Sequence, residues 1–176
     1  VATGGDMKWI HLAAATFPRG AEPGPDVMKP GDKVYAGPHW DEAPVHEVRL
    51  TKAFDIAASA VSMEDFARFD SNYRARVEAR RLAWKPGAPA VLVGWDEAVA
   101  YGEWLGKKEG QNYRLPTEAE CEYACSRLDR AVQEWCLDWW APYSAGPEVD
   151  PLGPRDGTVR VIRGGNIAGD RSAHMD

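Results

Sequence analysis

The sequence lacks the features that would place the chain in a membrane or on a nucleic acid. Its longest apolar runs, such as residues 56–61, are far shorter than the roughly 20 residues that cross a bilayer. Lys and Arg number 21 against 27 Asp and Glu, a net charge of −6 that excludes a broad basic surface. We therefore expect neither a membrane nor a nucleic acid as a partner. Residues 1–7 do not resemble a signal peptide, and the compartment stays open.

Common catalytic and metal-binding signatures are also missing. The three cysteines, Cys121, Cys125 and Cys136, are an odd number and leave no complete set of disulfide pairs. The four histidines are scattered and do not have the spacing of a zinc motif. Gly164-Gly165 lacks the third glycine and the following helix of a phosphate-binding loop, and no Gly-x-Ser-x-Gly segment occurs. The signals for the usual zinc, nucleotide and serine-hydrolase sites are therefore weak.

The sequence is rich in hydrophobic residues and in glycine and proline, which interrupt helices and strands. Hydrophobic residues make up 44% of 176 and include eight Trp, enough to bury one core. The 17 Gly and 13 Pro are spread along the chain, which favours short elements joined by ordered loops. We expect one domain over residues 1–176 with an α+β fold.

Alternation and composition predict short strands. In residues 44–50, Val48 and Leu50 lie on one face of a half-buried strand, and we expect His46 on the solvent face. The arginines between residues 74 and 81 are interpreted as a solvated face. Further strands are expected at residues 7–10 and 158–163, and a loop at residues 18–41.

Three helices have recognisable signals. Ser62 can cap a helix that carries Phe66 and Phe69 on one face. Apolar residues at helical spacing predict a second helix over residues 95–108. Thr117, with Glu120 three residues later, forms a capping box that begins the third.

One segment carries a more specific signal than its secondary-structure propensities. Residues 112–120 (NYRLPTEAE), followed by Glu122-Tyr123-Ala124, resemble the RLPTEAEWEYA signature of the formylglycine-generating enzyme, or sulfatase-modifying factor, family. Segments at 44–54, 93–105, 133–139 and 160–165 also resemble the family, in its order. The resemblance implies a compact, loop-rich fold related to C-type lectins, with short helices, small antiparallel sheets and, in many members, structural calcium.

The sequence does not contain the cysteines on which the chemistry of the family depends. The resemblance implies two cysteines just after Arg163-Gly164-Gly165 that bind copper and oxidise a substrate cysteine. Here Asn166–Ser172 contain no cysteine, so the chain resembles a variant without the catalytic cysteines and we expect no copper. Cys121 and Cys125 lie four residues apart, within reach of a shared metal. Because Cys121 stands where the family has a core Trp, we interpret both thiols, and Cys136, as buried apolar groups.

For calcium, the resemblance implies oxygen ligands around the Glu-Trp motif, where Glu134 matches. The family's asparagine position is Ala131 here, preceded by Arg130, which would weaken such a site. The chain is also short where the family carries a long loop, near residues 125–131, and again after residue 165. Either these regions are trimmed, or segments are absent from the sequence given.

Two functions follow. The first is a non-catalytic module that binds a glycan or a protein beside Gly165. Its proposed ligand-binding residues are Asn166, Asp170, Arg171, Trp139 and Trp140, because indole faces stack on sugars and on apolar surfaces. The alternative for each Trp is a place in the core. The second function is a copper-dependent oxidase that makes formylglycine on sulfatases, with catalytic segments missing from this chain. The sequence favours the module.

Overall fold

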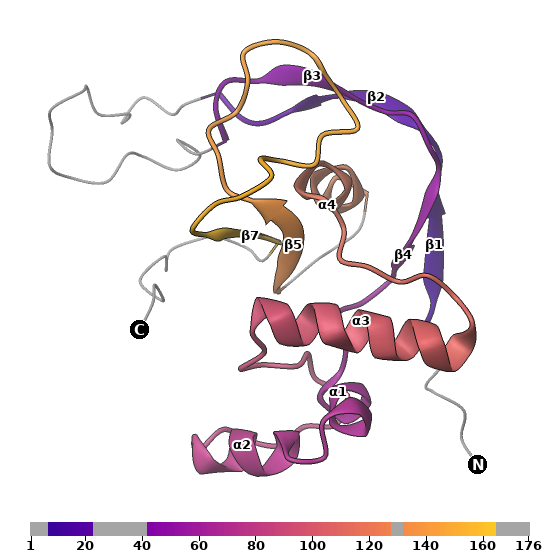
Figure 1. Cartoon of the computed structure of the whole chain (residues 1–176), viewed down its shortest axis with the longest axis vertical. Helices are drawn as coiled ribbons and strands as arrows, with labels where there is room; N and C mark the ends of the chain where they lie inside the picture. The colour runs from indigo at the N-terminus through magenta and orange to yellow at the C-terminus, as the bar shows by residue number, and fades with distance from the viewer. Residues whose placement is uncertain (1–6, 23–41, 128–131, 165–176) are drawn as a thin grey trace, which may run out of the picture.

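The computed structural model describes residues 7–22, 42–127 and 132–164. Within them, short helices and strands alternate in a mixed order, which confirms the predicted α+β, loop-rich fold. No helix in this part of the chain is long and apolar enough to cross a membrane. In chain order the elements are β1 (Trp9–Leu12), β2 (Ala15–Arg19), β3 (His46–Leu50), β4 (Phe54–Ala57), α1 (Met63–Phe69), α2 (Tyr73–Ala79), α3 (Trp95–Glu109), α4 (Glu118–Cys125), β5 (Gln133–Trp139), β6 (Glu148–Val149) and β7 (Arg160–Gly164) (Figure 1).

The strands form three small sheets. β1 pairs with β4, β2 with β3, and β5 with β7, all antiparallel as predicted. The two-residue strand β6 joins β3 in parallel, in addition to the predicted antiparallel pairs. A parallel pair requires a long connection, and here almost one hundred residues separate the two strands.

The position of His46 corrects an expectation. Val48 and Leu50 are buried, as predicted, but His46 lies on the same face and is 5% exposed. Residues two apart in a strand share a face, so the alternation that buries Val48 also buries His46. Its Nε2 lies 3.3 Å from a carboxylate oxygen of Glu148, and its ring meets Tyr143 edge-on.

Helix α4 lies between the β2–β3 layer and the β5–β7 pair (Figure 1). It begins as predicted: Thr117 accepts from the Glu120 N–H at 3.1 Å, and Glu120 accepts from the Thr117 N–H at 2.8 Å. One side of α4 packs Ala119, Tyr123 and Ala124 on the sheets, in a cluster with Leu12, Val48, Leu50 and Ile56. The other side buries Cys121 on β5 and β7.

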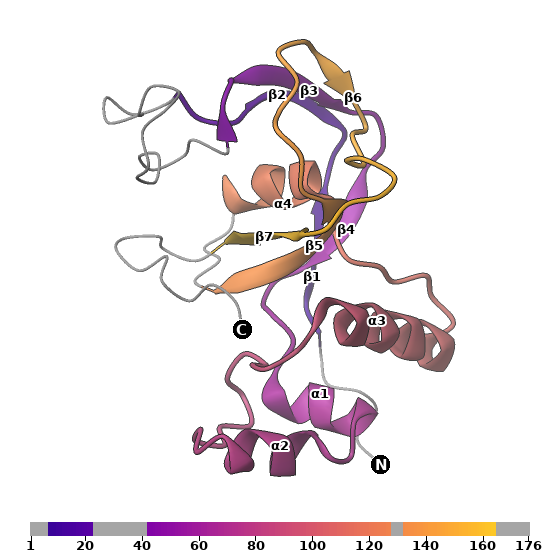
Figure 2. The same cartoon turned by 60° about the vertical axis from the view of Figure 1, so that its left-hand side comes forward.

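The remaining helices form a separate layer at the opposite end of the molecule (Figure 2). Ser62 caps α1, and α3 ends at Gly110 with φ 67°, a left-handed conformation that glycine adopts readily. Gly106 lies inside α3 rather than at its end. The sequence analysis missed α2, although Tyr73 and Val77 are fully buried at helical spacing. The aromatic cluster of this layer contains Met63, Phe66, Tyr73, Val77, Tyr101 and Leu105.

Candidate functional site

Of the predicted ligand-binding residues, only Trp139 and Trp140 lie in the part of the chain that the structure describes, and Glu134 is the predicted calcium ligand. Glu134 lies near the start of β5 and Trp139 at its end, a separation of about 16 Å at the usual rise of a strand. Trp140 follows β5 and is 40% exposed. Asn166, Asp170 and Arg171 lie outside the described residues. Binding by these residues beside Gly165 therefore stays a prediction.

The Trp139 side chain packs closely against its neighbours in the fold. The Arg160 guanidinium lies between two indoles, 3.6 Å from the ring centre of Trp95 and 3.4 Å from that of Trp139. Arg160 also donates to the Leu137 carbonyl at 2.8 Å. A Cβ on Gly157 would come within 2.9 Å of the Trp139 side chain, so the backbone packs closely on it. One face of Trp139 is thus covered by Arg160, which cross-links β7 to the start of α3.

A buried ionic network surrounds Tyr143, beside the end of β7. The Tyr143 hydroxyl donates to Glu118 at 2.9 Å and accepts from Arg163. Arg163 lies 2.7 Å from Glu118, and the Arg19 guanidinium stacks on the Tyr143 ring at 4.1 Å. Burial acts to lower the pKa of Arg163, but Glu118 and its neighbours outweigh burial and raise it. The network ties β2, α4 and β7 together.

Asp138 lies next to this network and is 3% exposed. One carboxylate oxygen accepts from the Glu118 N–H at 2.8 Å. Burial disfavours the charged form and raises the pKa of Asp138 to about 6, although the backbone hydrogen bond works against this shift. Asp138 therefore changes charge in a pH range where most carboxylates are already ionised.

Replacing Asp138 by asparagine should change the pH dependence of stability. The folded carboxyl titrates near pH 6 and the ordinary value is 3.8, so the folded state holds more protons between the two. Stability is consequently lost as the pH rises through this window. Asp138→Asn keeps an acceptor and removes the titration. Its stability relative to the parent should rise by about 1–3 kcal/mol between roughly pH 4 and 7.

The measurement is urea unfolding across this pH range, with the exposed substitution Asp156→Asn as control. A difference between Asp138→Asn and the parent that does not vary with pH would contradict the raised pKa.

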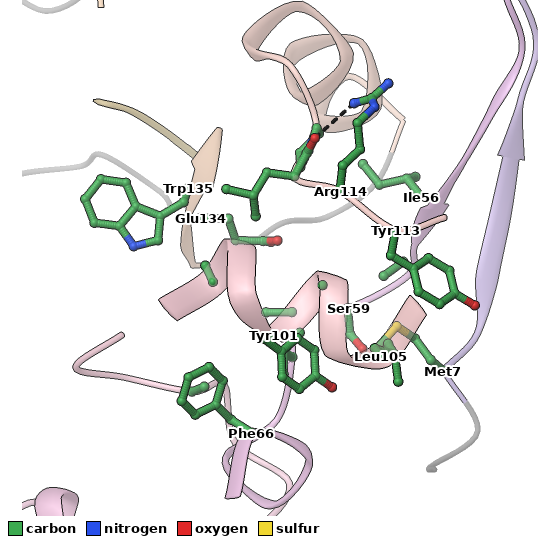
Figure 3. Close-up of a pocket in the computed structure, with 18 of the residues that line it drawn as sticks. Met7, Ile56, Ser59, Phe66, Tyr101, Leu105, Tyr113, Arg114, Glu134 and Trp135 are labelled. Carbon is green, nitrogen blue, oxygen red and sulfur yellow. Dashed lines mark hydrogen bonds between the residues drawn. The ribbon is translucent and has the colours of Figure 1, made fainter. Parts of the chain in front are cut away.

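A cavity of about 1070 Å³ lies elsewhere, between α3 and the strands β4 and β5 (Figure 3). Tyr101 and Leu105 of α3 form one wall, and Ile56 of β4 lies on the opposite side. Further walls come from residues 89–93, from the extended segment 111–116 and from residues 132–135. These five segments together border one mostly apolar space.

Several polar and charged side chains also line the cavity, and some of them are held by hydrogen bonds. Arg114 makes two hydrogen bonds of 2.7 Å to Glu120, so this guanidinium and carboxylate neutralise one another. The Tyr113 hydroxyl donates to Glu109 at 2.8 Å. Burial and this carboxylate raise the pKa of Tyr113 to about 12. Glu134 extends from β5 into the space beside α3, whereas its neighbour Trp135 points the other way (Figure 3).

Glu134 is therefore a lining residue of the cavity, in addition to its predicted role as a calcium ligand. Within residues 7–22, 42–127 and 132–164, no three His, Cys, Asp or Glu side chains are arranged to hold a metal ion. Side chains of the described residues thus do not by themselves fit the oxygen-rich shell that calcium requires. Calcium at Glu134 stays a prediction.

The thiols pack as expected from the sequence. Cys121 and Cys136 are fully buried with Val161, and half-buried Cys125 packs against them. This cluster fills the interface of α4 with β5 and β7, and its members act as small apolar groups. The expectation that copper is not bound stays a prediction.

Sequence reasoning missed the cavity because its residues carry no motif. Ala98, Tyr101 and Leu105 have helical apolar spacing, which is usual for a core and predicts nothing about the distance to the opposite wall. Arg114, which lies in the matched segment 112–120, forms an ion pair with Glu120. The available signal for the ionic network was the glutamate pattern of α4, where Glu118 and Glu120 are buried.

The family match and two relatives from the comparisons with known proteins agree on one family. The sulfatase-modifying factor enzyme 1-like domain family matches residues 13–131. A formylglycine-generating enzyme of Streptomyces coelicolor is 28% identical over 69% of this chain and 56% of its own length. One of Thermomonospora curvata is 26% identical over 84% of this chain and 81% of its own. The latter alignment runs for 253 residues, more than the chain contains, so that relative has insertions.

A protein with another name and a solved structure are also similar to this chain. The serine/threonine-protein kinase pkn1 of Chlamydia pneumoniae is 31% identical over 71% of this chain and 29% of its own length. The solved structure of PvdO from Pseudomonas aeruginosa matches with a TM-score of 0.61 at 21% identity, covering 89% of this chain and 81% of that one. This likeness supports the observed fold. The family match covers well over half of the sequence, and the chain therefore belongs to the sulfatase-modifying factor enzyme 1-like family.

Proposed function

We propose that this chain is a non-catalytic member of its family, a module that binds a glycan or protein ligand in the cavity between α3 and β4. The observation that carries the proposal is the cavity itself. Its volume of about 1070 Å³ lies just above the usual range of ligand sites, roughly 300–1,000 Å³, and its lining combines apolar walls with polar side chains.

Two findings support a module over an oxidase. Asn166–Asp170 offer amide, aliphatic and carboxylate groups where the family resemblance implies two thiols, and these groups would hold Cu(I) poorly. The matching region also makes up only 29% of a relative named as a protein kinase, so domains of this kind occur within larger proteins with other names.

The alternative is a copper-dependent oxidase that generates formylglycine. It is favoured by the names of the Streptomyces and Thermomonospora relatives. The chain spans 56% of the length of the first of these, so the activity of the whole relative is not transferred with the match.

The cavity can be tested with Nile red, a neutral dye that fluoresces in apolar surroundings. The parent protein should bind the dye saturably. Ala98→Trp places an indole in the cavity from α3, and we expect it to lower the dye affinity at least about tenfold while retaining stability, as cavity-filling changes commonly do.

Glu103→Trp is the matched control, because residue 103 is exposed on the same helix and does not line the cavity. It should bind the dye like the parent. Equal dye binding by parent, Ala98→Trp and Glu103→Trp would show that the dye sits elsewhere and would contradict the proposed site.

A further inference from the structure

The charged side chains that border the cavity already have partners. Arg114 and Glu120 compensate each other through two hydrogen bonds of 2.7 Å. Asp55 and Glu109 are exposed, each accepts a hydrogen bond, and water screens their charge. Glu134 also has an interaction partner. These five side chains therefore do not present an uncompensated charge that would hold a charged group of a ligand.

The interior of the cavity is lined by buried apolar side chains. Ile56 of β4, Phe66 of α1 and Leu105 of α3 all line it and are 7%, 2% and 7% exposed. A charged group placed against them would lose its water without gaining a partner, which is strongly unfavourable. The parts of an occupant that reach this interior are therefore apolar and uncharged.

Uncharged amides lie at the mouth of the cavity. Gln111 and Asn112, in the segment after α3, and Gln133, at the start of β5, line the cavity and are exposed. In the part of the chain that the structure describes, none of these three amide side chains makes a hydrogen bond. A carboxamide offers donors and an acceptor at once, which match the acceptor and the donor of a peptide group.

An apolar centre with an uncharged polar rim is typical of surfaces that bind proteins. A glycan would place hydroxyl groups against the apolar interior without hydrogen bonds. A hydrocarbon chain would leave the amides of the rim unused. The volume of about 1070 Å³ is large enough for several neighbouring side chains of one segment.

We propose that the occupant of the cavity is an uncharged segment of a partner protein. Its apolar side chains enter the interior, and its backbone groups form hydrogen bonds with the amides of Gln111, Asn112 and Gln133. This rests on the proposed function and specifies its ligand.

The test uses three blocked heptapeptides that share leucine and phenylalanine beside a central residue, which is norleucine, lysine or glutamate. Binding is measured by calorimetry and by displacement of Nile red. The norleucine peptide should bind at least about tenfold more tightly than both charged peptides. Its affinity should change less than about twofold between low and high salt. Asn112→Ala and Gln133→Ala should each weaken it about two- to tenfold, because each removes a hydrogen bond.

Asn72→Ala is the matched control, because Asn72 is an exposed amide that makes no side-chain cap bond and does not line the cavity. It should bind the norleucine peptide like the parent. A charged peptide that binds as tightly as the norleucine peptide, or unchanged affinity in both Asn112→Ala and Gln133→Ala, would overturn the inference.

Displacement of Nile red by maltotriose, a neutral oligosaccharide, and not by the norleucine peptide would also overturn it and make the ligand a glycan. If no peptide binds but Nile red binds and Ala98→Trp blocks it, the proposed function stands without this ligand. If neither peptides nor dye bind, both fail.

Discussion

Replacing Arg163 by alanine should lower the free energy of unfolding by about 3–5 kcal/mol. The Arg163 side chain is 14% exposed and pairs with Glu42, Glu118 and Glu122, while Tyr143 accepts a further hydrogen bond. Removal of the guanidinium leaves carboxylates buried without this counter-charge, a condition much less favourable than removing the whole network. Urea unfolding followed by tryptophan fluorescence measures the loss.

Arg74→Ala is the control, because Arg74 also bonds a carboxylate, Glu78, but is 62% exposed. Its loss should be about 0.5 kcal/mol or less. Adding Glu118→Gln to Arg163→Ala should recover part of the loss, since one unmatched charge disappears. A loss below about 1 kcal/mol in Arg163→Ala would contradict the account of a tightly buried network.

Replacing Phe66 by alanine should also cost about 3–5 kcal/mol. Phe66 is 2% exposed, and its ring centre lies 4.8 Å from that of Tyr73 and 5.5 Å from those of Phe69 and Tyr101. Because Phe66 also lines the cavity, truncation would enlarge an existing space rather than allow collapse. Thermal and urea unfolding both report the effect.

Phe66→Leu retains most of the apolar volume and should cost about 1 kcal/mol. Leu82→Ala, at a position 42% exposed, should change stability by less than about 0.5 kcal/mol. Similar losses for Phe66→Ala and Leu82→Ala would mean that the aromatic cluster is not the core of the helical layer.

Local signals in the sequence predicted much of the fold. Ser62 and Thr117 mark helix starts because their hydroxyls satisfy amides of the first turn, a short-range requirement that leaves a readable pattern. The family resemblance added the overall fold, which periodicity alone could not supply. At the start of α2, Asn72 is a residue type common at helix caps but makes no side-chain cap bond. The four arginines between residues 74 and 81 were interpreted as a solvated face, and the buried pair Tyr73 and Val77 was not recognised as helical.

Less of the candidate site than of the fold could be predicted from the sequence. Glu109, Ile56 and Glu134 are far apart in the chain, and only the fold brings α3, β4 and β5 around one space. A cavity forms where side chains leave the space between elements unfilled, and no pattern of residue types in the sequence indicates such a gap. His46 shows the related problem for charge, because its burial follows from strand alternation while its partner Glu148 comes from a distant strand.

Whether the chain is a binding module or an oxidase is tested most directly by peptide turnover. The protein is incubated with copper, oxygen, a reductant and a cysteine-containing sulfatase peptide, and the peptide mass is measured; the Streptomyces coelicolor relative serves as the active control. We expect an unchanged peptide mass with this chain, because Asn166–Asp170 contain no thiol to bind Cu(I) beside Arg163. Copper-dependent conversion of the cysteine to formylglycine would contradict the binding-module account and direct attention to Cys121 and Cys125.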